Sequence, residues 1–122
     1  PQDFSEWSRL SVHDLRLEGR AILNFQNQQI TRAVSRALFQ EVGPHLVPTV
    51  NSCLFQSEIG DELCRKYPEA RFSGVYYLNQ HGKEAWSLRS IGEFDVAEVA
   101  RLYGGGGHRN AAGFARQRIV FP

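Results

Sequence analysis

The sequence contains no methionine, only two cysteines, and no apolar run that approaches the roughly 20 residues needed to cross a bilayer. Membrane insertion is therefore excluded. Cys53 and Cys64 form no Cys-x-x-Cys pair, which argues against a zinc site or a disulfide framework and predicts buried, reduced thiols in a cytoplasmic protein. The chain begins at Pro1 without a secretory leader, and we expect it to be a piece of a longer protein.

Strong charge of either sign is also missing. Thirteen acidic and fourteen basic residues leave a net charge of +1, so any site for a polyanion must come from a local arrangement of residues. Apolar residues make up 42% of the chain and aromatic residues 11%, a composition typical of a globular protein. A chain of 122 residues is long enough for one domain that buries about 65% of its unfolded surface without disulfides or metal.

The first third of the chain predicts a long helix. Apolar residues recur at spacings of seven and four, at Leu23, Ile30, Val34, Leu38 and Val42. The helix is expected to begin after an N-cap at Ser11 and to end at Gly43-Pro44, and its residues 12–42 would span about 46 Å. Such a rod extends past a small core and suits a connector to a neighbouring domain, unless Gly19 divides it into two helices.

The rest of the chain predicts a mixed sheet. Its segments are a buried strand over 47–54, a helix over 57–67 that Pro68 ends, two strands over 72–79 and 83–91, a helix over 96–102 behind an Asp95 cap, and a closing strand over 119–121. The turn at residues 79–82 predicts that the two middle strands pair antiparallel. The fold class is therefore α/β (α+β): a mixed sheet of about four to five strands with helices packed on it. Residues 1–43 would form the linker helix or helices and residues 44–122 the domain.

One segment departs from ordinary composition. The stretch Gly104–Gly113 holds five of the eleven glycines, which lose much backbone entropy on folding. The amides of Gly104, Gly105, Gly106 and Gly107 are able to converge on an anion, and Ala111 with Ala112 looks like the start of a helix whose dipole favours that anion. His108 and Arg109 would stand at the mouth of this site. A simple flexible turn with a histidine beside it is the alternative.

Charge favours the anion site. Residues 101–122 carry four arginines and no acidic residue, a local charge of +4 in a chain of net charge +1. Such an excess favours phosphate or nucleic-acid ends. Arginines that only face solvent are the alternative, and we expect Arg116 or Arg118 to be of that kind.

The string from Gly104 to Phe114 resembles the signature of the DHH-associated C-terminal domain of the DHH phosphoesterase superfamily. The resemblance extends back over residues 96–103, 87–90, 57–60, 51–52 and 18–23. It implies a two-domain phosphodiesterase whose N-terminal domain holds two manganese ions, with this domain binding the substrate across a cleft. Relatives cleave short RNA, single-stranded DNA, cyclic dinucleotides, polyphosphate or a nucleotide-sulfate product.

The resemblance also implies a set of site residues. The glycine loop Gly104–Gly107 with His108 would contact the phosphate and sugar of a bound nucleotide, with Arg109 beside it. Arg89 would reach a second phosphate, and Asn51 and Ser57 match family positions near the cleft.

The chain departs from the superfamily in lacking an Asp-His-His triplet; the nearest string is Val12-His13-Asp14. Without the ligands of a dinuclear centre nothing here lowers the pKa of a water molecule. We expect this chain to bind no metal and to bind substrate without hydrolysing it, the manganese lying in the missing N-terminal domain.

Three functions remain open at this point. The chain is the substrate-binding half of a manganese-dependent exonuclease, nanoRNase or nucleotide phosphodiesterase; or a free-standing nucleic-acid-binding module; or a structural element that forms a homodimer through its N-terminal helix. The expected partners are a short single-stranded nucleic acid or nucleotide and the DHH domain of the same parent chain, with no membrane.

Overall fold

The computed structural model describes residues 4–118, and their side chains from residue 15 onward. Its elements in chain order are α1 (Phe4–Ser35), β1 (Leu38–Val42), β2 (His45–Asn51), α2 (Gln56–Lys66), β3 (Ser73–Leu78), β4 (Lys83–Arg89), α3 (Val96–Leu102), β5 (Gly106–His108) and β6 (Ala111–Gln117). The α/β class is confirmed: a long helix is followed by a six-stranded mixed sheet with two helices packed on it. The strand expected over 119–121 lies outside the described residues.

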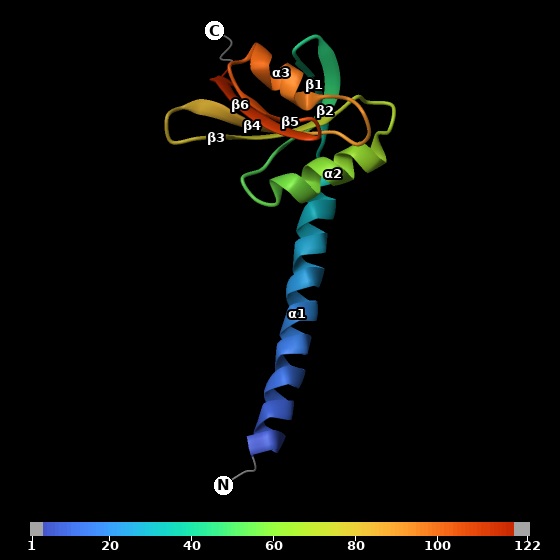
Figure 1. The fold of residues 1–122 in the computed structure, drawn as a ribbon, viewed down its shortest axis with the longest axis vertical. Helices are drawn as coiled ribbons and strands as arrows, with labels where there is room; N and C mark the ends of the chain where they lie inside the picture. Colours follow the sequence, from blue (N-terminus) through green and yellow to red (C-terminus); the bar gives the residue numbers. More distant parts are fainter. Residues whose placement is uncertain (1–3, 119–122) are drawn as a thin grey trace.

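Helix α1 is a single rod that projects from the sheet (Figure 1). Its 32 residues correspond to a length of about 48 Å. The helix begins at Phe4, so the N-cap expected at Ser11 is wrong, since Ser11 lies inside the helix. Gly19 does not divide it, because a single glycine lowers helix stability by only about 1 kcal/mol and the turns on both sides hold the backbone.

The C-terminal end of this helix differs from the prediction. Helix α1 stops at Ser35, and Leu38–Val42 forms strand β1, which pairs antiparallel with β2 around Gly43. Gly43 has a φ of 59°, the left-handed conformation that such turns need. The four-residue spacing of Val34, Leu38 and Val42 also fits an alternating strand. Pairing with β2 and complete burial of Val42 decide between the two.

The strand order across the sheet is β1-β2-β3-β4-β6-β5. Strands β2 and β3 run parallel, and every other neighbouring pair runs antiparallel. The predicted antiparallel pairing of β3 with β4 is confirmed, and Gly82 in their turn has a φ of 74°. The predicted buried strand is also confirmed, since residues 47–50 of β2 are buried.

Two hydrophobic clusters lie on opposite faces of the sheet, which α2 and α3 cover from opposite sides (Figure 1). Alternate residues of β4 point to opposite faces, and Trp86 and Leu88 are buried on the α3 side. On the other side Val75 packs with Ile59 and Leu63 of α2 and with Val34 of α1. The C-terminal end of α1 is thus part of the domain core.

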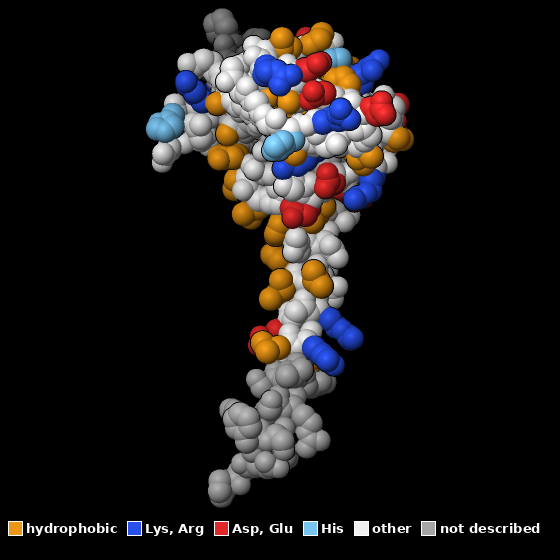
Figure 2. All heavy atoms as spheres, viewed as in Figure 1, with side chains coloured by type: hydrophobic (Ala, Val, Ile, Leu, Met, Phe, Trp, Pro, Cys, Tyr) orange, Lys and Arg blue, Asp and Glu red, His pale blue; other side chains and the backbone are white. Residues whose placement is uncertain are grey.

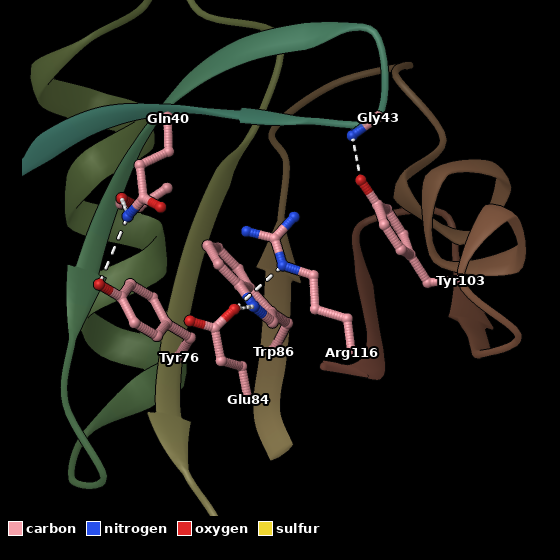
Figure 3. A network of polar contacts seen from close by, with 8 residues as sticks. Gln40, Gly43, Tyr76, Glu84, Trp86, Tyr103 and Arg116 are labelled. Atoms are coloured by element: carbon pink, nitrogen blue, oxygen red, sulfur yellow. Dashed lines mark hydrogen bonds and ion pairs between the residues drawn. The ribbon is translucent and has the colours of Figure 1, made fainter. Parts of the chain in front are cut away.

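Aromatic rings extend across the α3 side. Tyr103 stacks on Phe114 with ring centroids 4.3 Å apart, and Trp86 stacks on both Phe114 and Tyr76. The Arg116 guanidinium lies 4.6 Å from the Trp86 ring centroid, and its Nε donates to Glu84 Oε1 at 3.0 Å (Figure 3). Ring stacking and an ion pair therefore hold Arg116, whereas Arg118, the other arginine of that expectation, is exposed.

Candidate functional site

The second face of β4, β6 and β5 is only partly covered. Helix α2 packs on β2, β3 and β4, so that within the described part of the chain no helix covers the far half of the sheet on this side. Paired residues of neighbouring strands point to the same face. The residues that face this open side are Ala85, Ser87 and Arg89 of β4, Ala111, Gly113 and Ala115 of β6, and Gly106 and His108 of β5. All are half-buried or exposed, although those of β4 and β6 lie in the middle of the sheet.

Small residues leave the open face nearly free of protruding side chains. Ala85 pairs with Ala115, and Ser87 pairs with Gly113, which in turn pairs with Gly106. On the opposite face the same strands carry large buried side chains such as Trp86 and Phe114. A sheet surface with almost no side-chain bulk leaves room for a ligand to lie against the strands.

Arg89 is the charged group at the edge of this face. Its Nη2 donates to Ser57 Oγ at 2.8 Å and its Nη1 donates to the Leu88 carbonyl at 2.9 Å. Ser57 lies in the first turn of α2, so the helix and the sheet together orient the guanidinium. A Cβ at Gly60 would come within 2.7 Å of Arg89 Cγ, so the glycine makes room for the arginine stem. Three of the five guanidinium N–H groups remain for a ligand.

Arg89 and His108 belong to one row across the sheet. Arg89 pairs with Ala111, and Ala111 pairs with His108 at the edge strand β5. Two strand spacings separate them, about 10 Å. The side chains of His108 and Arg109 are exposed. The structure thus brings together three predicted site residues, Ser57, Arg89 and His108, on one side of the sheet.

The glycine loop has another conformation than the sequence predicted. The Gly104 amide donates to the Arg101 carbonyl at 3.1 Å and the Gly105 amide to the Ala100 carbonyl at 2.9 Å. Gly106 and Gly107 belong to strand β5, which pairs with β6. The amides of Gly104 and Gly105 therefore cap the C-terminal end of α3 and are already used by internal hydrogen bonds.

The expected helix start at Ala111 and Ala112 is also wrong, because Ala111–Gln117 is strand β6 and lies between β4 and β5. Sheet pairing on both sides prevails over the helix preference of two alanines. No helix dipole is aimed at the loop from this segment. An anion at the loop would instead meet the exposed side chains of His108 and Arg109 and the edge of β5.

The structure requires glycine at the four positions to different degrees and for different reasons. Gly104 has a φ of +83°, which other residues adopt only with strain. A Cβ at Gly105 would meet the Gly113 carbonyl oxygen at 2.1 Å, and one at Gly107 would meet Ala112 Cα at 2.6 Å. Among residues 4–118, no atom lies within 4 Å of such a Cβ at Gly106. Packing of the chain itself therefore explains Gly105 and Gly107 but leaves Gly106 unexplained.

Sequence reasoning missed the residue that anchors the loop. Ser90 is 4% exposed, and its Oγ donates to the carbonyls of Phe94 and Arg109 at 2.8 and 3.2 Å. Asn110 Nδ2 donates to Ser90 Oγ at 2.9 Å and to the Gly92 carbonyl at 3.0 Å. A buried hydroxyl needs hydrogen-bond partners. The signal in the sequence was therefore a serine that continues the buried positions of the alternating pattern directly after β4.

Asn51 lies apart from this row. It is the last residue of β2 and lines a separate pocket against α1. Gln56, which the sequence did not single out, approaches the open face, where its Oε1 accepts from Ser87 Oγ at 3.4 Å.

The described residues contain no group of three or more His, Cys, Asp or Glu side chains that would hold a metal ion. Cys53 is exposed, contrary to the expected burial, because it lies in the loop after β2. Cys64 is half-buried, and this burial raises the pKa of its thiol. Neither forms a disulfide.

Basic, acidic and histidine side chains are mixed on the sheet-bearing part, and hydrophobic side chains stand out from the projecting helix (Figure 2). Within residues 4–118, no helix combines the length and the apolar character that a bilayer span requires.

Comparisons with known proteins place the chain among partial relatives. No family model matches it. It is 31% identical over 113 residues to the oligoribonuclease NrnB of Bacillus subtilis, and 32% identical over 123 residues to the uncharacterized protein R106 of Acanthamoeba polyphaga mimivirus. These matches cover 86% and 93% of the chain, but the chain spans only 28% and 29% of those proteins.

A solved structure of an uncharacterized protein from Helicobacter pylori shares the fold, with a TM-score of 0.52, 21% identity and coverage of 81% of this chain and 26% of that one. The chain is therefore homologous to part of an oligoribonuclease. This relation is consistent with the resemblance of its glycine-rich segment to the DHH-associated C-terminal domain.

Proposed function

We propose that the chain is the substrate-binding domain of a DHH-type phosphoesterase and that it binds the phosphates of short single-stranded RNA on the open face of the sheet. The observation that carries this proposal is the row of Arg89, Ala111 and His108, with Ser57 holding the guanidinium in place. The relation to an oligoribonuclease supports RNA as the substrate class.

The chemistry of phosphate recognition fits this row. Arg89 offers donors in a planar fork that matches two phosphate oxygens. His108 and Arg109 add donors at the edge strand, about two strand spacings away. The small side chains between them let a sugar-phosphate backbone approach the sheet. Arg109 also adds a positive charge beside His108, in a stretch of the chain that contains no acidic residue.

Hydrolysis is assigned by this proposal to another domain of the parent protein. The two manganese ions that the resemblance implies need several carboxylate and imidazole ligands, and the described residues supply no such group. The chain would thus position the phosphodiester, and the partner DHH domain would hold the ions that activate water. Helix α1, whose base packs in the domain core, would connect the two domains.

The test is a titration of a di- or triribonucleotide into the wild-type chain and an Arg89→Gln variant. We expect the variant to lose about 1.5–3 kcal/mol of binding free energy, the usual size of a charge-assisted contact. Arg101→Gln is the matched control, because Arg101 is an exposed arginine in the last turn of α3, which covers the other face of the sheet. Equal affinities of wild type and Arg89→Gln, or equal losses in both variants, would contradict the proposal.

A second experiment uses the longer parent protein. With manganese it should hydrolyse the same oligonucleotide, and the 122-residue chain should bind it intact. Binding without hydrolysis by the parent would favour a free-standing nucleic-acid-binding module.

A further inference from the structure

A second pocket lies away from the open face, between the C-terminal half of α1 and strands β1 and β2. Its volume is about 380 Å³, within the range of about 300–1,000 Å³ that is typical of ligand sites. None of the residues that line it is acidic. The pocket contains Asn51 and none of Ser57, Arg89 and His108.

One stripe of α1 forms the first wall. Phe25, Gln29 and Arg32 line the pocket from α1 at spacings of four and three, so their side chains lie on the same side of the helix. Arg36 also lines the pocket, from the turn that follows the end of α1 at Ser35. Arg32 and Arg36, four residues apart, both line the pocket, are exposed and form no ion pair within the described part of the chain. Their guanidinium groups are therefore free to converge on one anion.

The sheet forms the opposite wall. Gln40 Nε2 donates to Thr49 Oγ1 at 2.7 Å and to Tyr76 Oη at 3.4 Å, which fixes this wall (Figure 3). Phe55 adds a third aromatic ring to the lining, beside those of Phe25 and Tyr76. The side-chain amides of Gln29 and Asn51 have no hydrogen bond to other described residues, so their donors and acceptors remain for a ligand.

We propose that this pocket binds a nucleoside monophosphate. The paired arginines suit the phosphate, which they contact as charged donors. The rings of Phe25 and Phe55 suit the planar base, because every base presents a π-face for stacking. The free amides of Gln29 and Asn51 match the donors and acceptors of a base edge. This site is separate from the open face and does not depend on the function proposed for it.

The test is a titration of AMP into the 15N-labelled chain carrying Arg89→Gln, followed by the backbone amide signals in NMR spectra. This substitution weakens nucleotide binding on the open face, so the chemical-shift changes should come mainly from the second pocket. AMP should shift the amides of residues 25–36 and 49–55. Adenosine and inorganic phosphate, which each lack half of the ligand, should bind at least about tenfold more weakly.

Two variants examine the contacts directly. Arg32→Gln combined with Arg36→Gln should raise the Kd of AMP at least about tenfold, and Phe25→Ala at least about fivefold. The matched controls are Arg16→Gln with Arg20→Gln, an exposed pair with the same four-residue spacing on α1, and Ile22→Ala, which removes an exposed apolar side chain. Both controls should leave the Kd unchanged.

The outcomes separate the two proposals. Shifts confined to β5 and β6 would overturn this site and leave the open face as the nucleotide site. Equal binding of AMP and inorganic phosphate, or equal losses in the variants and their controls, would overturn it as well. Amide shifts in residues 25–36 and 49–55 that disappear in the Arg32→Gln, Arg36→Gln double variant would support the second pocket. This support would hold whatever Arg89→Gln does to RNA binding.

Discussion

The four consecutive glycines allow a sharp test of which of them the fold requires. Single substitutions to alanine at Gly104, Gly105 and Gly106 change the same residue type within three adjacent positions, so composition and local sequence are matched. The structure predicts three different results, because the space and the backbone conformation differ at each position.

Gly105→Ala should be strongly destabilising. The added Cβ would come within 2.1 Å of the Gly113 carbonyl oxygen and 2.8 Å of Phe114 Cα. Both atoms belong to the backbone of β6, so relief requires the strand to shift. Overpacking of this kind reduces the free energy of unfolding by about 1–3 kcal/mol, and a clash with backbone puts this variant at the upper end.

Gly106→Ala should leave stability unchanged or raise it. No atom of the described residues lies within 4 Å of the new Cβ, and the position has no positive φ. Under those conditions a Gly to Ala change stabilises by about 0.4–1 kcal/mol, because it restricts the unfolded chain. The methyl group would point onto the open face, beside Gly113 and Ser87, so RNA binding should weaken while stability does not.

Gly104→Ala should lower the free energy of unfolding by an amount between those of the other two variants. Space is open around it, but its φ of +83° would strain an alanine by about 1–2 kcal/mol. Urea unfolding followed by circular dichroism gives all three values on one scale. If Gly105→Ala proves as stable as the wild type, or Gly106→Ala loses more than Gly104→Ala, then the role assigned to these glycines is wrong.

Two further predictions concern single side chains. Burial raises the pKa of the Cys64 thiol above its ordinary value of 9.0, so the stabilising contribution of the protonated thiol is present below about pH 9 and is lost as the pH rises through the folded pKa. Urea unfolding at pH 7.5 and pH 10 should therefore show a larger loss of stability for wild type than for Cys64→Ala; equal losses would remove Cys64 as the cause. Asp95 accepts from the Ala97 amide at 2.9 Å as the N-cap of α3, and Asp95→Ala should lower the free energy of unfolding by about 0.5–2 kcal/mol. The exposed Glu93→Ala is its control, and an equal effect there would exclude capping as the reason.

Local features of the fold could be predicted from the sequence. The cap at Asp95, the end of α2 before Pro68 and the hairpin around Gly82 each depend on residues within one turn of the chain. Such features need no partner from elsewhere in the fold, so residue type and spacing suffice. The buried strand β2 was predictable for a related reason, since a run that is apolar on both faces has to be covered.

Features that depend on distant pairing could not be predicted. Leu38–Val42 has a spacing that fits both a helix and a strand, and only pairing with β2 settles its conformation. Ala111–Gln117 becomes a strand because β4 and β5 hold it from both sides. The candidate site changed accordingly, from a ring of glycine amides to a row of side chains across the sheet.

The sequence by itself determined which residue types carry charge and which segment lacks bulk: a basic, glycine-rich stretch without acidic residues, Arg89 in a strand and Ser57 at a helix start. Only the tertiary structure decided which of these residues meet. Register places Arg89, Ala111 and His108 in one row and leaves Asn51 against α1, because strand pairing joins residues that lie far apart along the chain.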